Sequence, residues 1–373
     1  MDSPLRVLMV SKACIVGIYQ RKLEEIARLG IDLRVIVPPS WRDERGEMYL
    51  ERAYTEGYAL KVLPLRINGN FHLHHYAGLR REIRAFQPHI VHIDEEPYNL
   101  VSWLAHYHAR RVGARSLFFS WQNIYRRYPP PFSWGERWLM RTTDYMLVGT
   151  DSAGDVWRQK GFTGKLSTIP QFGIDPELFH PAKSRPSRPF TIGFIGRLVE
   201  EKGLSVLFEA VAMIPGEWRL IILGGGPLAD DLKRKTADAG LQARIDFIGQ
   251  VASTDMPAQY HTLDVLALPS LTRPNWKEQF GRVLIEAMAS EVPVIGSDSG
   301  AIPGVIGEGS IAGGLVVPEG DASALYDALT RLRDDPVLRS RLGAQGRRRV
   351  LANFTHEQIA KATVSVYHEI IAM

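Results

Sequence analysis

Two glutamates, Glu278 and Glu286, have seven residues between them in a segment that reads as the start of a helix near Gly281. The segment follows an apolar run that predicts a buried strand. A helix that begins at such a strand end offers free N–H groups and the positive end of its dipole to an anion. The two carboxylates would instead accept hydrogen bonds from hydroxyl groups of the same ligand. The alternative is that both are solvated surface charges, and this segment alone does not decide.

A second cluster combines a glycine with two cations. An apolar run ends at Gly196, and Arg197 and Lys202 follow in a loop before a helix that starts near Gly203. Arginine holds a diphosphate through two parallel hydrogen bonds, whereas lysine supplies a mobile point charge. Gly196 leaves room for the backbone to approach a ligand. Taken alone the pattern is weak, because loop cations are usually solvated.

A third segment, Gly224-Gly225-Gly226-Pro227, follows a predicted strand. It lacks the G-x-G-x-x-G spacing of dinucleotide-binding loops, and neither half of the chain has that pattern. The segment therefore predicts a tight turn from strand to helix, and an NAD-dependent dehydrogenase is disfavoured.

These segments, in this order, resemble one family, the family 4 retaining glycosyltransferases with the GT-B fold. The resemblance spans about residues 165–355 and includes the Arg197/Lys202 loop, the glycine turn, the Glu278/Glu286 helix and residues 173–181, 247–251, 269–270 and 291–295. Residues before 165 share only a general α/β pattern and a few positions with it. The resemblance implies two doubly wound, Rossmann-like domains that face each other across a cleft.

The resemblance also implies a role for each residue. Arg197 and Lys202 would hold the donor diphosphate and stabilise the leaving group. Glu286 would accept the ribose hydroxyls, and Glu278 would bind hydroxyls of the donor sugar. The remaining donor contacts would come from the backbone of Phe280, Gly281 and Arg282, and from Gln250 and Val251 beside the base.

Two positions in the first half depart from the family pattern. Gly17 matches the glycine loop near the phosphate only loosely, because the usual paired glycines are absent from the segment around it. Gln122 stands where many members carry a histidine near the reacting sugar. Glutamine can hydrogen-bond the donor sugar but cannot titrate, so a general base is not expected there. This fits a reaction in which the leaving phosphate takes the acceptor proton.

The resemblance implies catalysis without a metal or another cofactor. Negative charge builds on the departing diphosphate, and preorganised cations at such a charge contribute about a few kcal/mol each. No D-x-D motif occurs, and the single cysteine excludes a cysteine-based metal site. His72, His74 and His75 form a cluster, but no matching pair of acidic ligands is recognisable.

The acceptor side is less well defined. Asp94-Glu95-Glu96 follows a predicted strand and is a candidate for facing the cleft. Residues 125–134, with Trp138, are aromatic and basic. They fit an acceptor lid or a membrane-surface contact, and equally a loop that packs its own aromatic rings.

The elements that must position these residues alternate between apolar runs and amphipathic segments. The apolar runs lie at 6–10, 33–37, 89–93, 116–119 and 145–148, and again at 191–195, 219–223, 245–248, 265–268 and 292–295. Helical patterns separate them, for example over 100–112 and 204–213. The alternation predicts an α/β protein in which a parallel sheet is covered by helices on both faces, once in each half.

Residues 181–189 contain three prolines, two serines and three basic residues, which is typical of a linker. We therefore expect an acceptor-side domain at 1–180 and a nucleotide-sugar domain at 190–354. Residues 355–373 begin with a capping box at Thr355 and carry Ile359, Ala362, Val366 and Ile370 on one side. This helix is expected to pack back across the linker.

Composition supports a globular protein of two domains. The chain has 373 residues, of which 45% are hydrophobic and 23% charged. No apolar run reaches the ~20 residues of a membrane helix, and the start lacks a signal-peptide pattern. Cys14 has no partner for a disulfide, which favours a cytoplasmic protein.

Charge is unevenly distributed. Residues 1–185 hold 26 Lys and Arg against 19 Asp and Glu, which leaves 19 against 22 for the rest. A basic first half favours anionic partners, including the inner membrane face, although a solvated surface explains it equally well. No run of basic residues suggests nucleic acid as a partner.

The resemblance thus implies a retaining glycosyltransferase that moves a sugar from a nucleoside-diphosphate donor to a glycan, lipid-linked or small polar acceptor, and UDP comes before GDP because it is the commoner donor base in the family. Two alternatives remain. A nucleotide-sugar epimerase can share the fold, and a non-catalytic nucleotide-sugar-binding protein would keep the same donor residues.

Overall fold

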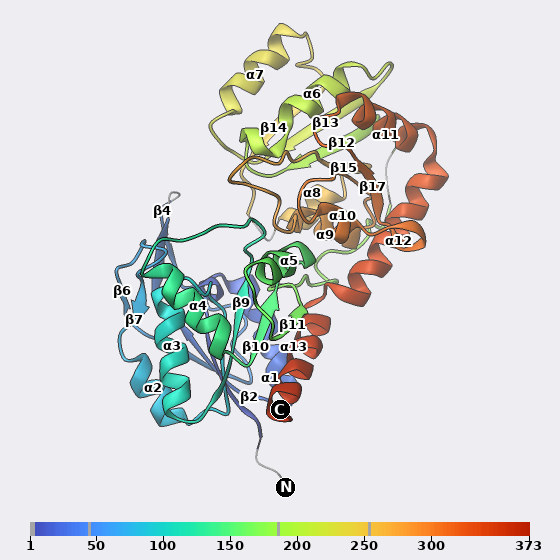
Figure 1. Ribbon diagram of the computed structural model, residues 1–373. Helices are drawn as coiled ribbons and strands as arrows, with labels where there is room; N and C mark the ends of the chain where they lie inside the picture. Colours follow the sequence, from blue (N-terminus) through green and yellow to red (C-terminus); the bar gives the residue numbers. More distant parts are fainter. Residues whose placement is uncertain (1–3, 44–45, 185–186, 253–254) are drawn as a thin grey trace. The chain divides into compact units, whose positions relative to one another are not determined.

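The computed structural model describes residues 4–43, 46–184, 187–252 and 255–373. The chain divides into two compact units (Figure 1). The first unit comprises the chain up to Gly173 and again from His356, and the second comprises Ile174–Thr355. Each unit contains one large sheet whose strands are all parallel, as the sequence predicts.

The first unit contains a seven-stranded sheet in the order β11-β10-β9-β8-β1-β2-β5. Its strands are β1 (Arg6–Val10), β2 (Asp32–Val37), β5 (Ala59–Val62), β8 (Ile90–Ile93), β9 (Arg115–Ser120), β10 (Tyr145–Val148) and β11 (Lys165–Thr168). Five of these coincide with predicted apolar runs. The two edge strands, β5 and β11, escape prediction because their residues are half-buried or exposed and form no apolar run.

Helices cover both faces of this sheet, and alternate residues of β1 show the two cores. Val7 and Met9 lie in one apolar cluster with α1 (Arg21–Arg28) and α13 (His356–Ile371). Leu8 and Val10 lie in the other, which α2 (Leu79–Phe86), α3 (Leu100–Arg111), α4 (Phe132–Thr142) and α5 (Asp151–Gln159) complete. This period of two is that of a strand buried on both sides.

Short elements lie between the strands of the first unit. Two 3-10 turns follow β1, at η1 (Ala13–Ile15) and η2 (Gly17–Gln20). Two antiparallel strand pairs follow β2 and β5, namely β3 (Ser40–Asp43) with β4 (Gly46–Tyr49), and β6 (Leu65–Arg66) with β7 (His75–Tyr76).

The second unit contains a six-stranded sheet in the order β14-β13-β12-β15-β16-β17. Its strands are β12 (Phe190–Ile195), β13 (Trp218–Leu223), β14 (Ile245–Gly249), β15 (Val265–Leu268), β16 (Val294–Ser297) and β17 (Gly314–Val317). Its helices are η3 (Glu200–Lys202), α6 (Leu204–Ala212), α7 (Ala229–Asp238), α8 (Met256–Tyr260), α9 (Arg282–Ala289), α10 (Ile302–Ile306), η4 (Gly309–Ile311), α11 (Ala322–Asp334) and α12 (Pro336–Asn353). Apolar clusters again lie on both faces of the sheet.

The division between the units differs from the predicted linker at 181–189. Ile174 donates its N–H to the carbonyl of Phe354, and the side chains of Ile174 and Phe179 are buried in an apolar cluster of the second unit. The chain therefore enters the second unit at Ile174, because these apolar contacts precede the proline-rich segment. Residues 185 and 186 of the predicted linker lie outside the described residues.

Helix α13 belongs to the first unit, where it packs against α1. Ile359, Val366 and Ile370 are buried in that unit's core, and Tyr367 donates or accepts a 2.7 Å hydrogen bond with Nδ1 of His92 on β8. The predicted apolar face differs at one position. Ala362 is exposed, and Thr363 is buried instead, with its hydroxyl bonded to the carbonyl of Ile359.

Over the described ranges, none of the helices combines the length and apolar character that crossing a membrane requires.

Candidate functional site

The loops after β12, β13, β14 and β15 carry the residues that the sequence assigned to a donor site. These four strands are neighbours in one parallel sheet, so their carboxyl ends lie at the same edge. Arg197 and Lys202 follow β12, the glycine turn follows β13, Gln250 and Val251 follow β14, and Glu278 and Glu286 follow β15. The second unit thus gathers these residues at one sheet edge.

Lys202 and Glu278 form an ion pair at this edge. The Lys202 ammonium donates to Oε2 of Glu278 at 2.6 Å, and the hydroxyl of Ser270 donates to the same oxygen at 3.0 Å. The ring of Trp276 lies 5.0 Å from the Lys202 nitrogen. Glu278 is 7% exposed, so its charge is largely shielded from solvent. The pair holds Lys202 in one place while the ammonium keeps further N–H donors for a ligand.

Two glycines allow the backbone around this pair to pack closely. Gly203 has φ +69°, and a Cβ there would lie 1.8 Å from the carbonyl oxygen of Pro269. Gly300 has φ +57°, and its Cβ would lie 2.1 Å from the carbonyl oxygen of Glu278. No side chain fits at either position. The loop of Lys202 therefore packs directly against the end of β15, and the backbone of Glu278 packs directly against the loop after β16.

Glu286 lies in α9 with both carboxylate oxygens engaged. Oε2 accepts a 2.7 Å hydrogen bond from the hydroxyl of Tyr260, and Oε1 accepts a 2.8 Å bond from Nε of Arg282. The side chain of Arg282 is therefore committed to Glu286. Each carboxylate oxygen has a second lone pair, so an oriented Glu286 can still accept hydrogen bonds from a ligand.

The start of α9 is defined by Gly281 and Phe280. Gly281 has φ +73° and precedes the first helical residue, Arg282. The ring of Phe280 packs edge-on against Phe354, with centroids 5.8 Å apart. The helix start is thus anchored by an aromatic contact, and its first N–H groups lie at the carboxyl edge of the sheet.

Arg197 and the glycine turn belong to one packed unit. Cβ atoms on Gly224 and Gly226 would lie 1.9 Å from the Gly196 carbonyl oxygen and 2.5 Å from that of Leu198. The turn therefore supports the loop that carries Arg197, beyond making the predicted turn between β13 and α7. The Arg197 side chain is exposed, and within the described ranges its guanidinium has no hydrogen bond or ion pair.

Gln250 and Val251 occupy different environments at the end of β14. Gln250 is exposed and lies beside the glycine turn, where a Cβ on Gly225 would meet its side chain at 3.8 Å. Val251 is partly buried against the apolar cluster that includes α9. Gln250 is thus free to meet a ligand, whereas Val251 is partly used in packing.

In the first unit, Gly17 is buried and its amide is occupied. Its N–H donates to Oε2 of Glu51 at 2.6 Å, and a Cβ at Gly17 would lie 2.8 Å from that oxygen. The segment around it forms the 3-10 turns η1 and η2, in keeping with the missing paired glycines. Glu51, which the sequence did not single out, therefore takes the position that an anionic ligand would take at this amide.

Gln122 lies directly after β9 and is 7% exposed. Its Oε1 accepts a 2.9 Å hydrogen bond from Nζ of Lys160, whereas its Nε2 has no hydrogen-bond partner within the described part of the chain. Lys160 in turn forms a very short ion pair with Glu136. Sequence reasoning missed Lys160 and Glu136, because they come from different helices and carry no motif.

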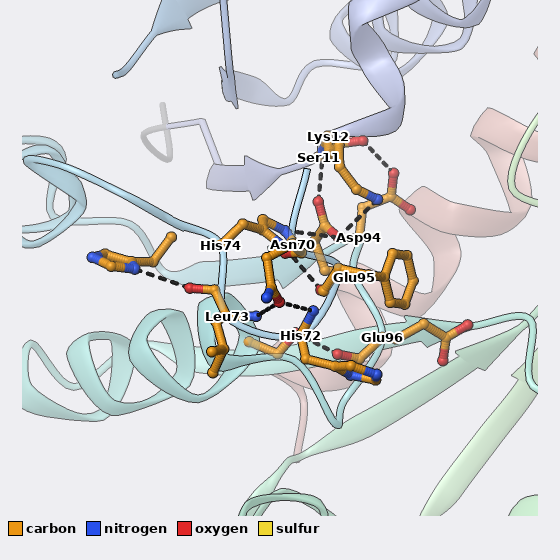
Figure 2. A network of polar contacts seen from close by, with 12 residues as sticks. Ser11, Lys12, Asn70, His72, Leu73, His74, Asp94, Glu95 and Glu96 are labelled. Atoms are coloured by element: carbon orange, nitrogen blue, oxygen red, sulfur yellow. Dashed lines mark hydrogen bonds and ion pairs between the residues drawn. The ribbon is translucent and has the colours of Figure 1, made fainter. Parts of the chain in front are cut away.

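In the acidic segment after β8, Asp94 and Glu95 are buried and Glu96 is half-buried, and the three side chains extend in two directions (Figure 2). Asp94 accepts a 2.6 Å bond from the hydroxyl of Ser11, and Glu95 accepts a 2.8 Å bond from the N–H of Lys12. Figure 2 shows Glu96 extending away from both. Its carboxylate accepts hydrogen bonds from the hydroxyl of Ser120 at 2.6 Å and the N–H of Trp121 at 2.7 Å.

The two glutamates of this segment differ in pKa. Burial alone would raise the pKa of Glu95, but the charges and hydrogen bonds of Lys12 and His74 outweigh it, and the pKa is lowered. Burial raises the pKa of Glu96 to about 7, because the bonds from Ser120 and Trp121 only partly offset it. Glu96 is therefore the carboxyl group here that titrates near neutral pH.

The side chains of the histidine cluster face backbone carbonyl groups and a carboxylate, and they do not converge on one site. Nδ1 of His74 lies 3.1 and 2.9 Å from the carbonyls of Asn70 and Phe71, and its Nε2 lies 3.6 Å from Glu95 (Figure 2). His75 contacts the carbonyl of Leu73. Across the residues whose positions are described, no three His, Cys, Asp or Glu side chains are grouped to hold a metal ion.

The aromatic segment 125–138 packs largely on its own unit. Tyr128 stacks on Tyr98 with centroids 4.4 Å apart, and Phe132 lies 5.0 Å from the ring of His72. Trp134 is 63% exposed on α4. Most of these rings thus pack against neighbours, and Trp134 remains an exposed aromatic side chain.

Two family models match the chain, one in each unit. A model described as glycosyl transferases group 1 matches residues 176–349, and one described as a glycosyl transferase 4-like domain matches residues 18–170. The first match contains every donor-site residue described above.

Curated relatives carry glycosyltransferase names. The lipopolysaccharide core biosynthesis mannosyltransferase LpsB of Rhizobium meliloti (strain 1021) is 32% identical over 253 residues, which are 63% of this chain and 68% of the relative. The D-inositol 3-phosphate glycosyltransferase of Mycobacterium tuberculosis (strain F11) is 28% identical over 260 residues, 65% of this chain and 52% of that protein.

Solved structures share the fold over nearly the whole chain. Sucrose-phosphate synthase from Thermosynechococcus elongatus superposes with a TM-score of 0.73 at 21% identity, covering 99% of both chains. HepE of Anabaena in complex with UDP superposes with a TM-score of 0.73 at 16% identity, covering 98% of this chain and 100% of HepE.

Proposed function

This chain belongs to the family of group 1 glycosyltransferases and has the GT-B fold, and on that premise we propose that it transfers a sugar from a nucleoside-diphosphate sugar to an acceptor with retention of configuration. The observation that carries the proposal is the gathering of Arg197, the Lys202–Glu278 pair and Glu286 at one sheet edge. The acceptor class is a glycan, a lipid-linked sugar or a small polar molecule.

The two cations would act on the leaving group in different ways. Arg197 is exposed and carries no partner in the described ranges, so it is available for bidentate contact with the diphosphate. Lys202 is held by Glu278 and would direct its remaining N–H donors to the same group. As the bond from the anomeric carbon to the diphosphate oxygen breaks, both cations stabilise the charge that develops.

Glu286 and Glu278 would recognise hydroxyl groups. Tyr260 and Arg282 orient the Glu286 carboxylate, whose remaining lone pairs would accept the ribose hydroxyls. Glu278 would accept hydroxyls of the donor sugar while it holds Lys202. Phe280, Gly281 and Arg282 would line the sugar and phosphate through their backbone, and Gln250 and Val251 would lie beside the base.

The proton of the acceptor would go to the leaving diphosphate. The acceptor oxygen attacks the anomeric carbon from the face that the diphosphate leaves, and an oxygen of that diphosphate takes the acceptor's proton. Gln122 cannot take it, because an amide does not titrate at neutral pH. The chemistry asks for no metal and no other cofactor, since Arg197 and Lys202 supply the positive charge.

The donor base and the place of action extend the proposal. We favour UDP before GDP, which the UDP complex of the structurally similar HepE supports. The mannosyltransferase name of LpsB makes GDP-mannose the second donor to test.

We also propose a cytoplasmic enzyme at the inner membrane face. A pocket of the first unit, lined by Arg80, Arg84, Tyr107, His108 and Arg111, would meet anionic headgroups.

A two-step experiment tests the function. First, a thermal-shift panel of UDP-glucose, UDP-galactose, UDP-N-acetylglucosamine, GDP-mannose and ADP-glucose identifies the donor, because a bound ligand raises the apparent stability. Second, the donor that binds is incubated with candidate acceptors, and nucleoside-diphosphate release and the anomeric configuration of the product are measured.

Each failure has a distinct meaning. Free epimerised nucleotide sugar without acceptor would indicate an epimerase. A donor that binds but is never consumed would indicate a non-catalytic binding protein. A product of inverted configuration would contradict the retaining mechanism.

A further inference from the structure

The side-chain amide of Gln122 is held at one end and unpartnered at the other. Its oxygen accepts from Lys160, whereas Nε2 is buried without a hydrogen-bond partner in the described part of the chain. A buried donor without a partner costs free energy, so such a group calls for a physical reason. A ligand atom that completes the hydrogen bond is one such reason.

Lys160 decides which way the amide points. An ammonium group has three donors and no acceptor, so only the oxygen of an amide can face it. The oxygen and nitrogen of a glutamine side chain are otherwise nearly interchangeable in space. The Lys160 contact therefore fixes the opposite end of Gln122 as an N–H donor.

Lys160 itself is held by an ion pair and two rings. Its ammonium bonds to Glu136 on α4 and lies 4.6 Å from the ring centroid of Trp157 and 5.3 Å from that of Tyr128. The side chains of Lys160 and Glu136 are only 4% and 9% exposed. The Lys160 ammonium, which orients Gln122, is therefore held in place by the protein and shielded from solvent.

The backbone of Gln122 is fixed as well. Its N–H donates to the hydroxyl oxygen of Ser120 at 3.1 Å, and that hydroxyl donates to Glu96. The turn after β9 is thus held by a carboxyl group from the end of β8. The main chain and the side chain of Gln122 are set by two independent chains of hydrogen bonds.

We propose that Lys160 and Glu136 are positioning residues that present the amide N–H of Gln122 as a dedicated hydrogen-bond donor to an acceptor oxygen of a sugar substrate. The proposal rests on the proposed function, within which it gives the Gln122 position a defined polarity. A histidine there could donate, accept or titrate, whereas this glutamine only donates at its free end. Lys160 and Glu136 touch no substrate and act through Gln122.

Activity measured in a mutant cycle tests the proposal. The variants are Gln122→Ala, Glu136→Leu with Lys160→Met, and all three together, assayed by nucleoside-diphosphate release from the donor that the wild type consumes. Both ion-pair partners are replaced at once, because an apolar pair avoids leaving one buried charge alone. We expect Gln122→Ala to lower kcat/KM about tenfold to a hundredfold while activity stays measurable.

The cycle separates positioning from a structural role. If Lys160 and Glu136 act through Gln122, removing the pair costs about as much as Gln122→Ala, and the triple variant is no worse than either. Effects that multiply would overturn the proposal. Lys165→Met with Glu369→Leu removes an exposed ion pair of the first unit and serves as a control, which should keep full activity.

Gln122→Glu tests the polarity of the free end. The carboxylate keeps an oxygen for Lys160 but replaces the free N–H donor with an acceptor. We expect it to lose at least as much activity as Gln122→Ala. Wild-type activity in Gln122→Glu would show that the substrate donates to this position, and would sink the proposal.

A measurement without substrate keeps this test apart from the proposed function. In protein labelled with 15N at glutamine side chains, the Gln122 amide signal is identified by its loss in Gln122→Ala. We expect one sharp, slowly exchanging signal in the wild type, and a broadened or shifted signal when Glu136 and Lys160 are replaced. An unchanged signal would overturn the positioning role, whereas absence of any donor turnover would overturn the function alone.

Discussion

The candidate site residues of the two units differ in how fully their polar groups are satisfied. In the second unit, Lys202 pairs with Glu278, and Glu286 is engaged by Tyr260 and Arg282. In the first unit, Gln122 Nε2 and Asp94 Oδ1 are buried without a hydrogen-bond partner in the part of the chain that is described. Polar groups that already have partners can bind many diphosphate ligands, whereas buried groups that lack a partner depend on one ligand shape.

This comparison separates binding of a common chemical group from selection of a particular molecule. The diphosphate needs cations at a sheet edge, and the second unit supplies Arg197, which is exposed, and Lys202, whose side chain is 19% exposed. Selectivity needs desolvated polar groups that lose a partner when the wrong ligand enters. We therefore expect substitutions in the second unit to affect turnover more than folding, and those in the first unit to affect both.

The largest expected effect is that of Lys202→Ala. The change removes a leaving-group cation and also takes the ammonium partner away from the mostly buried carboxylate of Glu278, which keeps its hydrogen bond from Ser270. We expect kcat to fall about a hundredfold to a thousandfold, and the melting temperature to fall as well, because the mostly buried Glu278 carboxylate loses its counter-charge. Steady-state kinetics with saturating donor measure this, and Lys235→Ala on α7 is the matched control. An unchanged rate would refute the leaving-group role.

Arg197→Ala should have the next largest effect. Its guanidinium has no partner within the described ranges, so its removal leaves no charge stranded. We expect kcat to fall about tenfold to a hundredfold, less than for Lys202→Ala. Parallel kinetics on the two variants give the comparison. If Arg197→Ala were the more damaging of the two, pairing with Glu278 would not be what makes Lys202 important.

Glu286→Ala should mainly weaken nucleotide binding. The carboxylate is proposed to accept hydrogen bonds from the ribose, and the loss of charged hydrogen bonds costs about 1.5–3 kcal/mol. Calorimetric titration with UDP and GDP should therefore show about a tenfold to hundredfold lower affinity. Tyr260→Phe, which removes only the hydroxyl that orients Glu286, should show a smaller loss. Unaltered affinity in Glu286→Ala would remove the assignment.

The smallest expected effect concerns stability and pH in the first unit. The pKa of Glu96 is raised to about 7 in the folded state, chiefly by burial, so the folded protein binds this proton more tightly than the unfolded chain does. The contribution of Glu96 is present below its ordinary pKa and is lost as pH rises through about 7. Because Glu96 is half-buried, we expect a loss of about 1 kcal/mol.

Glu96→Gln checks this expectation, because it carries no titrating proton. Denaturant unfolding at several pH values between 5 and 8 should show a flatter pH dependence for the variant than for the wild type. Identical slopes would mean that Glu96 is ionised in the folded protein throughout this range, and that its surroundings are more polar than the structure indicates.

The sequence predicted the second unit better than the first, and the reason is physical. The donor residues lie in short motifs at strand ends, and the carboxyl ends of parallel strands all lie at the same edge of the sheet. The cluster of Gln122, Lys160 and Glu136 combines a loop after β9 with the middle of α4 and the residue after α5, which no local pattern brings together. Edge strands β5 and β11 escaped prediction because exposure removed their apolar signal, and the short edge strand β17 of the second unit was not predicted either.

The domain boundary shows the same limit. Proline-rich composition indicated 181–189, yet the backbone bond from Ile174 to Phe354 brings the chain into the second unit earlier. Amino-acid composition indicates where a packed helix or strand cannot form. Long-range contacts decide to which unit an ordered segment belongs. The sequence likewise placed Ala362 on the buried face of α13, whereas Thr363 is buried instead. The rotation of a helix about its own axis is set by packing alone.

The return of the chain at His356 has a consequence for biosynthesis. The second unit is one uninterrupted stretch, so all of it is synthesised before α13, the last helix that covers the sheet of the first unit. The apolar surface of α1 and its sheet stays bare until Ile359, Val366 and Ile370 arrive. The second unit can therefore complete its fold before the first unit does, and the nascent amino-terminal half is the part that a chaperone would protect.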